Sequence, residues 1–179
     1  MNLEMNIKNL VLTHYDEKIA INLLKNMIEI PSVSGEETEI AKYTADFMKE
    51  RGFHKVYLQE VVEGKYQTIG LVKGKGVGKS IMLCGHLDIF PPPADMTNPY
   101  KAYIENNRIY GAGVADMKAG TAATIMAADA ILQSEVEIKG DIIVALVMEE
   151  EIGGVGIKYL LEKGFTADMG IVPESTNLE

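Results

Sequence analysis

The apolar positions of the first fifty residues repeat at helical spacing. Residues 16–30 form one predicted helix, whose apolar stripe consists of Ala20, Leu23, Leu24, Met27 and Ile28. A second helix is predicted after Ser34, because Ser34 and Glu37 have the S-x-x-E spacing of a capping box, and Gly52 is a suitable end for it. Its predicted buried face consists of Ile40, Tyr43, Phe47 and Met48.

Short apolar runs in the rest of the chain predict strands that alternate with helices. The predicted strands are 55–60, 66–72, 80–86, 141–148 and 169–174, and the predicted helices are 117–133 and 155–163. A hairpin is predicted to turn at Asn106-Asn107. This alternation indicates an α/β fold with a central, mostly parallel or mixed sheet flanked by helices. No linker divides residues 1–179, so we expect no internal domain boundary.

Charge and cysteine content narrow the classes of function. The net charge is -9 and the 17 basic residues are scattered, which argues against binding to nucleic acid or to an anionic membrane. The apolar runs are too short for a transmembrane helix, and the amino terminus does not resemble a secretory signal. Cys84 is the one cysteine, so no intrachain disulfide or Cys-rich zinc site is possible, and we predict a cytoplasmic protein.

Two glycine-rich segments resemble nucleotide-binding motifs without matching them. The segment "GKGVGKS" from Gly74 has Lys73 where a phosphate-binding loop needs glycine, and a predicted strand follows it instead of a helix. The segment "GAGVAD" from Gly111 has Asp116 where a dinucleotide fingerprint needs its third glycine. Both are interpreted as turns.

Polar residues gather at the predicted strand ends and after one glycine-rich turn. They are His86, Asp88, Asp116, Glu149, Glu150, Glu151 and Glu174. Each alone has an ordinary interpretation: a structural histidine, a helix cap, a solvated acidic loop or an exposed glutamate. Together they indicate a site for a divalent cation such as zinc, cobalt or manganese, because ligands of open α/β sheets bind at the carboxyl ends of strands. The surplus of carboxylates indicates either two metals or one acid left free as a base.

The same segments carry a family resemblance. "GHLD", "YGAGVADMKAG", "EEEIGGVG" and "VPESTNL", with "IEIPSVSGEE" before them, resemble the motifs of the zinc amidohydrolases and exopeptidases that include acetylornithine deacetylase, succinyl-diaminopimelate desuccinylase, aminoacylase and carboxypeptidase G. The resemblance implies a zinc-exopeptidase-like fold. It also implies hydrolysis of an amide bond in N-acyl amino acids or small peptides by two Zn²⁺ ions, with Co²⁺ or Mn²⁺ as substitutes.

The resemblance also implies individual roles. His86 and Glu174 would bind the first metal, Glu151 the second, and Asp116 would bridge both, preceding a cis peptide bond to Met117. Glu150 would be the general base and Asp88 would orient His86, whereas Glu149 would not be a ligand. Two positions depart from the family pattern, because Ala112 stands where Arg is common and Ser175 where Pro is usual.

Length is the largest departure from that family. The resemblance implies that 1–179 is the amino-terminal part of a catalytic domain, without the lid or dimerisation domain and without the carboxy-terminal part. His14 and His54 are the other histidines, and neither is predicted to lie near the motifs. We therefore expect the isolated chain to be inactive and to self-associate through exposed apolar surface. The alternatives are a non-catalytic α/β module with a binding or structural role, and a related dizinc aminopeptidase, over which the "DMKAG" context favours the deacylases.

Overall fold

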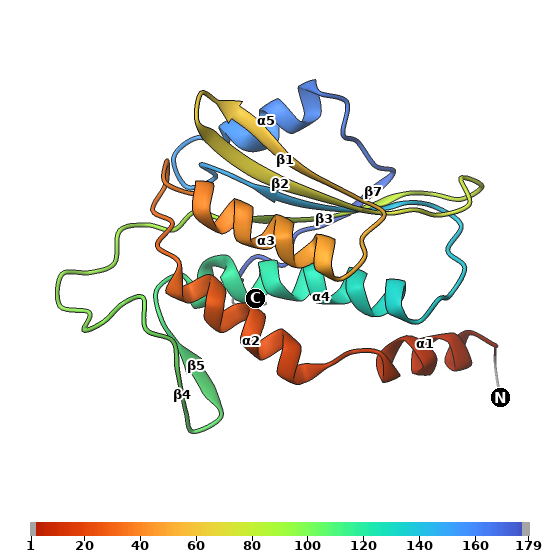
Figure 1. Ribbon diagram of the computed structural model, residues 1–179, viewed down its shortest axis with the longest axis horizontal. Helices are drawn as coiled ribbons and strands as arrows, with labels where there is room; N and C mark the ends of the chain where they lie inside the picture. The colour runs from red at the N-terminus through yellow and green to blue at the C-terminus, as the bar shows by residue number, and fades with distance from the viewer. Residues whose placement is uncertain (1–2, 177–179) are drawn as a thin grey trace.

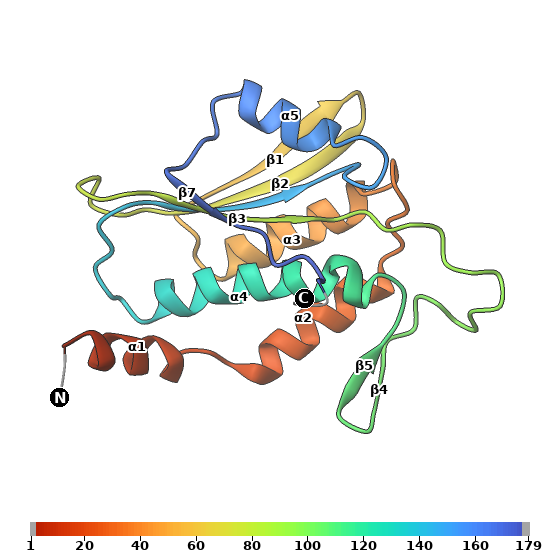
Figure 2. The same cartoon turned by 180° about the vertical axis from the view of Figure 1, so that it is seen from behind.

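The computed structural model describes residues 3–176, in which a central sheet lies between two layers of helices (Figures 1 and 2). The helices are α1 (Leu3–Thr13), α2 (Glu17–Glu29), α3 (Thr38–Glu50), α4 (Ala119–Gln133) and α5 (Val155–Glu162). The strands are β1 (Lys55–Val62), β2 (Lys65–Val72), β3 (Ile81–His86), β4 (Tyr103–Glu105), β5 (Arg108–Tyr110), β6 (Ile142–Val147) and β7 (Met169–Ile171). A short helical turn, η1 (Val114–Lys118), leads into α4. The predicted α/β class is confirmed.

The sheet is mixed, and its five strands lie in the order β1-β2-β6-β3-β7. β3 pairs in parallel with both β6 and β7, whereas β2 is antiparallel to β6 and forms a hairpin with β1. The predicted strands that carry the polar motifs are therefore neighbours, as expected. Since β3, β6 and β7 run in the same direction, their carboxyl ends meet at one edge of the sheet.

The central strand β6 supplies both hydrophobic cores, since alternate side chains of a strand point to opposite faces. Ile142, Val144 and Leu146 belong to the core on the side of α2, α3 and α4. Ile143, Ala145 and Val147 belong to the smaller core that α5 closes with Leu160. A strand buried on both faces explains why its sequence is a continuous apolar run rather than an alternating one.

Local signals predicted some element ends correctly and one wrongly. Gly52 follows the end of α3 with a φ of 83°, and the β4–β5 hairpin turns at Asn106 and Asn107, both at positive φ. The predicted capping box at the start of α3 is wrong. Ser34 donates its hydroxyl to Asp88, and no side chain caps the helix at Glu37. The box failed because both side chains have partners far away in the sequence.

Helix α1 was not predicted from the pattern of apolar residues. It lies on the helical side of the sheet, in contact with α4 (Figure 1). The side chains of Ile7, Leu10 and Leu12 are exposed. Among the described residues, no helix has the combination of length and hydropathy needed to cross a lipid bilayer. The Gly74–Ser80 segment is a loop followed by β3, which confirms that it is not a phosphate-binding loop.

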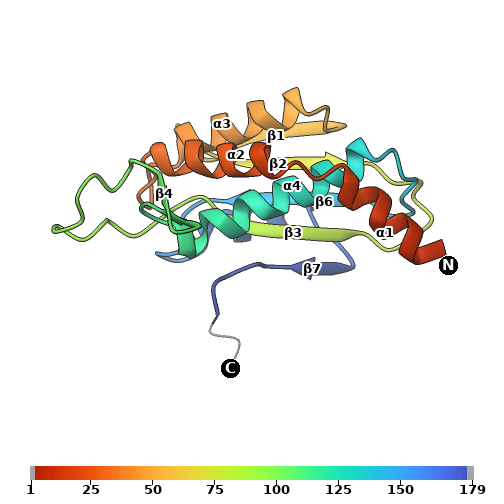
Figure 3. The ribbon, with the colours of Figure 1, turned by 90° about the horizontal axis from the view of Figure 1, so that it is seen from below.

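Strand β7 forms an edge of the sheet and is solvent-exposed (Figure 3). Within residues 3–176 it pairs in the sheet with β3 alone, so backbone groups along its other side have no strand partner there. Met169, Ile171 and Val172 are 49%, 52% and 60% exposed. An exposed apolar edge strand is a template on which another strand can add, so β7 is the strand through which we expect the predicted self-association to occur.

We expect Ile171→Lys to reduce self-association of the 179-residue chain, because a charged side chain on an edge strand opposes pairing with a second strand. Sedimentation velocity over a range of concentrations should show a shift towards monomer. Ile104→Lys is the matched control, since Ile104 is 51% exposed in the separate two-stranded sheet of β4 and β5. Equal association by both variants would contradict the assignment of β7.

Candidate metal centre

The candidate metal centre lies where β3, β6 and β7 end. His86 is the last residue of β3 and pairs with Val147 at the end of β6. The segment that follows β6, here called the acidic turn, consists of Glu149, Glu150 and Glu151. Glu174 follows β7, and Asp116 comes from η1. The sheet therefore brings together the polar residues that the sequence placed at strand ends.

The ring of His86 is held with one nitrogen directed at the carboxylates. His86 is 1% exposed, and its Nδ1 lies 2.8 Å from the backbone carbonyl oxygen of Asp88, so Nδ1 carries the hydrogen of that bond. The Nε2 atom lies 3.1 Å from Asp116 Oδ1 and 3.5 Å from Glu174 Oε2. Histidine that binds a metal commonly has its other nitrogen fixed by such a bond.

The carboxylate of Asp88 is fully buried and connects His86 to the acidic turn. It accepts hydrogen bonds from Ser34 Oγ at 2.8 Å and from the backbone N–H groups of Glu150 and Glu151, each at 3.1 Å. Its Oδ1 lies 3.5 Å from His86 Nδ1. Burial raises the pKa of Asp88, but these partners outweigh burial and hold the pKa below its usual value. No local pattern in the sequence indicates that Asp88 also binds the turn.

Asp116 is positioned by the η1 turn, which is attached to α2. The peptide bond between Asp116 and Met117 is cis, as the family resemblance implied. Lys118 is fully buried, and its Nζ donates to the carbonyl oxygens of Met27 at 2.8 Å and Ile30 at 3.0 Å. Burial lowers the pKa of Lys118 to about 8. The side chain of Asp116 is 55% exposed, so it remains accessible from solvent.

The remaining carboxylates differ in where they point. Donor atoms of His86, Asp116 and Glu151 all lie within 4.8 Å of one another, whereas Glu150 is exposed and outside this group. The side chain of Glu149 pairs instead with Lys65 at 3.3 Å. Glu174 is brought close because the Pro173 carbonyl lies against Gly120, where a Cβ atom would be only 2.3 Å from that oxygen.

One imidazole nitrogen and several carboxylate oxygens form a suitable donor set for a divalent cation. Burial, together with the nearby charge of Asp116, raises the pKa values of Glu151 and Glu174. The carboxylates of Asp116 and Glu151 are crowded, since their donor atoms lie within 4.8 Å of each other. A bound cation would relieve that repulsion, so the residues present fit a metal ion.

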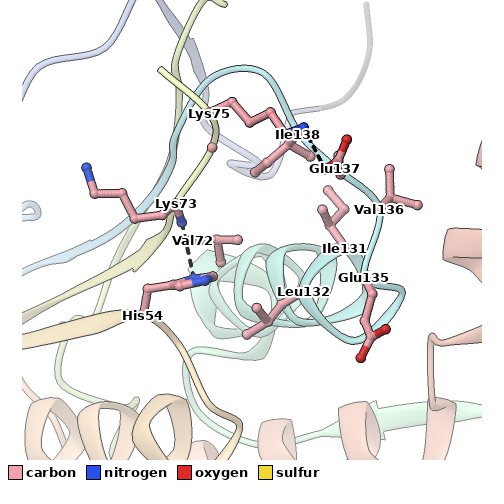
Figure 4. Close-up of a pocket in the computed structure, with 11 residues that line it drawn as sticks. His54, Val72, Lys73, Lys75, Ile131, Leu132, Glu135, Val136, Glu137 and Ile138 are labelled. Atoms are coloured by element: carbon pink, nitrogen blue, oxygen red, sulfur yellow. Dashed lines mark hydrogen bonds and ion pairs between the residues drawn. The ribbon is translucent and has the colours of Figure 1, made fainter. Parts of the chain in front are cut away.

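The other two histidines lie elsewhere. His14 follows α1. His54 lies in a pocket of about 430 Å³ with Val72, Leu132 and Ile138, and its Nδ1 accepts a hydrogen bond from Lys73 N (Figure 4). Val72 pairs with Ile142 at the start of β6, whereas the candidate metal centre lies where β6 ends. This pocket is therefore at the opposite end of the strands from the candidate metal centre.

A second pocket, of about 410 Å³, borders the candidate metal centre. Its walls are two loops, residues 89–93 and 111–115, together with Met96, Asp116 and Glu151. Apart from those two carboxylates its lining is uncharged, and it includes Phe90, a run of three prolines and Ala112. No basic side chain is among these lining residues.

Comparison with known proteins assigns the chain to a family. The sequence pattern of "Peptidase family M20/M25/M40" matches residues 82–179, which is more than half of the chain. The chain belongs to this family. An N-formyl-4-amino-5-aminomethyl-2-methylpyrimidine deformylase from Halalkalibacterium halodurans is 28% identical over 94% of this M20 chain and 42% of its own length. A succinyl-diaminopimelate desuccinylase from Rickettsia canadensis is 29% identical, with 87% and 43% covered.

Solved structures show the same fold at lower sequence identity. A tripeptidase from Staphylococcus aureus matches with a TM-score of 0.75 at 22% identity, over 90% of this M20 chain and 44% of that protein. A dinuclear metal-binding peptidase of the M20 family from Bacillus subtilis matches with a TM-score of 0.61 at 22% identity, over 82% and 39%. The M20 chain thus spans about two fifths of the length of the relatives and structures it matches.

Protonation of His86 should make the stability of the metal-free M20 chain depend on pH. Burial lowers the pKa of His86, but Asp88 and the charge of Glu174 raise it to a net value of about 9, from 6.5 for a free imidazole. A folded-state pKa above the unfolded value stabilises the fold fully below pH 6.5. This contribution is lost as the pH rises through about 9.

Urea unfolding in the presence of a chelator, at about pH 6 and about pH 9.5, should therefore show a change in the free energy of unfolding that is less favourable to the folded state at the higher pH in wild type than in His86→Gln. His86→Gln removes the titrating group and should lose this part of the pH dependence. The same pH dependence in both proteins would contradict the raised pKa of His86.

Proposed function

We propose that this chain provides metal ligands and the general base of a hydrolase that cleaves the amide bond of N-acyl amino acids or small peptides. The proposal rests mainly on one observation. Donor atoms of His86, Asp116 and Glu151 lie within 4.8 Å of one another at the carboxyl ends of the strands. Glu174 lies beside them, 3.5 Å from His86 Nε2. Membership of the M20 family supports this class of reaction.

Zinc is the proposed metal, because a mixed imidazole and carboxylate set suits it, with Co²⁺ or Mn²⁺ as substitutes. His86, Asp116 and Glu174 would hold the first ion, and Asp116 with Glu151 would hold the second. Bound zinc ions would polarise the scissile carbonyl and acidify a water molecule. The dinuclear peptidase among the structural matches supports two ions in the complete site.

Glu150 is the proposed general base. It extends from the same turn as Glu151, is exposed, and is outside the group of three donor residues. A carboxylate that is not itself a ligand is free to take a proton from water and to pass it to the leaving amine. Asp88 would position both the nitrogen ligand and the proposed base, since it contacts His86 and binds the amide of Glu150.

The pocket beside the candidate metal centre is suited to bind an uncharged, apolar group of the substrate. Its lining combines Phe90, Met96 and prolines with two carboxylates that would face the metal. An anionic group placed there would meet no basic side chain among the lining residues. We therefore favour substrates with a small apolar acyl group or side chain.

We also propose a cytoplasmic location, because the single cysteine, Cys84, fits a reducing compartment.

We expect the 179-residue chain to bind one zinc ion weakly and a second poorly, because the proposed second site has only Asp116 and Glu151 among the described residues. Hydrolysis of N-acetyl amino acids by this chain should be negligible. Calorimetric zinc titration alongside an assay on N-acetyl amino acids tests both expectations. Two tight sites, or robust turnover, would show that this division of the site is wrong.

Two variants separate the roles of ligand and base. His86→Ala should abolish binding of the first zinc ion, since it removes the nitrogen ligand. Glu150→Gln should leave zinc affinity within about threefold of wild type, because a base that is not a ligand contributes little to the equilibrium. Loss of zinc binding in Glu150→Gln would assign Glu150 to the metal instead.

A further inference from the structure

Glu37 is a buried acid that the proposed chemistry does not use. It is 1% exposed, although glutamate is almost never fully buried without a partner. Burial is the main reason that the pKa of Glu37 is raised, and the charge of Asp88 adds to it. A side chain that is costly to bury needs a compensating role in the fold.

The carboxyl group of Glu37 does not cap the helix that it precedes. No side-chain bond from Glu37 reaches the first turn of α3. Instead, Oε1 accepts a hydrogen bond from Gly35 N at 2.8 Å and another from Glu149 N at 3.0 Å. The second of these contacts spans 112 residues of sequence and reaches the first residue of the acidic turn. The other oxygen, Oε2, is buried and makes no hydrogen bond among the described residues.

Glu37 and Asp88 together bind three successive backbone amides. Glu37 holds the N–H of Glu149, and Asp88 holds those of Glu150 and Glu151. Glu149 has a φ of 49°, a left-handed conformation that is uncommon for a residue other than glycine. The three amides of the turn thus find their partners outside it, and these partners add to the turn's own bonds from Gly153 N and Gly154 N in keeping its backbone in this shape.

The loop that carries Glu37 is itself tied to the segment after β3. Val33 pairs with Ile89, and Ser34 N donates to the Ile89 carbonyl. Ser34 Oγ also donates to Asp88. The loop is thus anchored on one side to Asp88 and on the other to the acidic turn, so it can set the distance between them.

We propose that Glu37 is a positioning residue that fixes the acidic turn through the Glu149 amide and so places Glu151 within reach of the metal. The inference rests on the proposed function only in taking Glu151 as a ligand. Because donor atoms of His86, Asp116 and Glu151 lie within 4.8 Å of one another, Glu151 can also contact the single ion that this chain is expected to bind. Glu37 touches neither the proposed metal nor the substrate, and it acts through the backbone of the turn. Groups that hydrogen-bond directly to metal ligands change metal affinity by about 10–100-fold when they are removed. Glu37 acts one step further away, through the Glu149 amide, so we expect an effect at the lower end of that range.

Two substitutions at Glu37 distinguish its hydrogen bonds from its volume. Glu37→Leu removes both acceptors while keeping an apolar side chain of similar size, and we expect it to weaken Co²⁺ affinity about tenfold and to alter the visible spectrum of the bound ion. Glu37→Gln retains an oxygen that can accept both N–H groups, and its amide nitrogen replaces the unbonded Oε2. It should restore affinity to within about threefold. Glu36→Leu is the matched control, since Glu36 is exposed.

A double-mutant cycle tests whether Glu37 affects metal binding through Glu151. In a Glu151→Gln background, Glu37→Leu should weaken Co²⁺ binding no further, because the ligand that it positions has already been removed. A further tenfold loss in that background would overturn the proposal, since it would indicate general destabilisation. Equal affinities of Glu37→Leu and wild type would also overturn it.

Amide hydrogen exchange provides a readout that does not depend on metal. Exchange at Glu149, Glu150 and Glu151 should accelerate at least about tenfold in Glu37→Leu, while amides of β6 stay protected. If wild type fails to bind Co²⁺ but this local change occurs, the metal proposal fails and the positioning role stands. Unchanged exchange in the acidic turn would overturn the positioning role, whatever the metal result.

Discussion

The buried carboxylate of Asp88 is the interaction on which the candidate metal centre depends. A charge with no solvent exposure is tolerated only when several donors compensate it, and Asp88 has donors from three separate segments. Ser34 belongs to the loop before α3, His86 ends β3, and Glu150 and Glu151 follow β6. Removing the carboxylate would leave the Ser34 hydroxyl and two amides of the acidic turn unpaired. It would also remove the negative charge beside the imidazole, whose Nδ1 would then be held by its bond to the Asp88 backbone carbonyl alone. The positions of the nitrogen ligand and of the proposed base are therefore coupled.

Periodic apolar patterns predicted the layers of the fold because burial repeats with the geometry of the element. The run from Ile142 to Val147 was recognised as a strand, and the structure buries both of its faces. The Asn106-Asn107 turn was recognised because those residues tolerate positive φ. Ser34 and Glu37 misled because their spacing fits a helix cap, while their actual partners, Asp88 and Glu149, are distant in sequence. The spacing of residues along the sequence does not show whether a side chain will bind a nearby backbone group or a distant partner.

The residues of the candidate site could be predicted as a group because a parallel sheet brings strand ends together. His86, Asp116, Glu151 and Glu174 do meet at one edge. The residues that support them could not be predicted in the same way. Lys118 and Glu37 are charged side chains next to helix starts, where charge is ordinary, and only their burial shows that each bonds to a distant backbone group. Buried charge is a property of the tertiary structure and leaves no periodic signal.

The exposure of Asp116 at the mouth of a carboxylate cluster has a kinetic consequence. A cation approaching from solvent meets a half-exposed carboxylate before the buried imidazole, in a chain whose net charge is -9. Converging negative charge focuses the electric field and raises the local concentration of cations, which accelerates their association. Capture of a divalent ion should therefore slow as the ionic strength of the solution rises, while its escape depends on the inner ligands. The association rate and the dissociation rate of the metal ion are therefore governed by different parts of the same cluster.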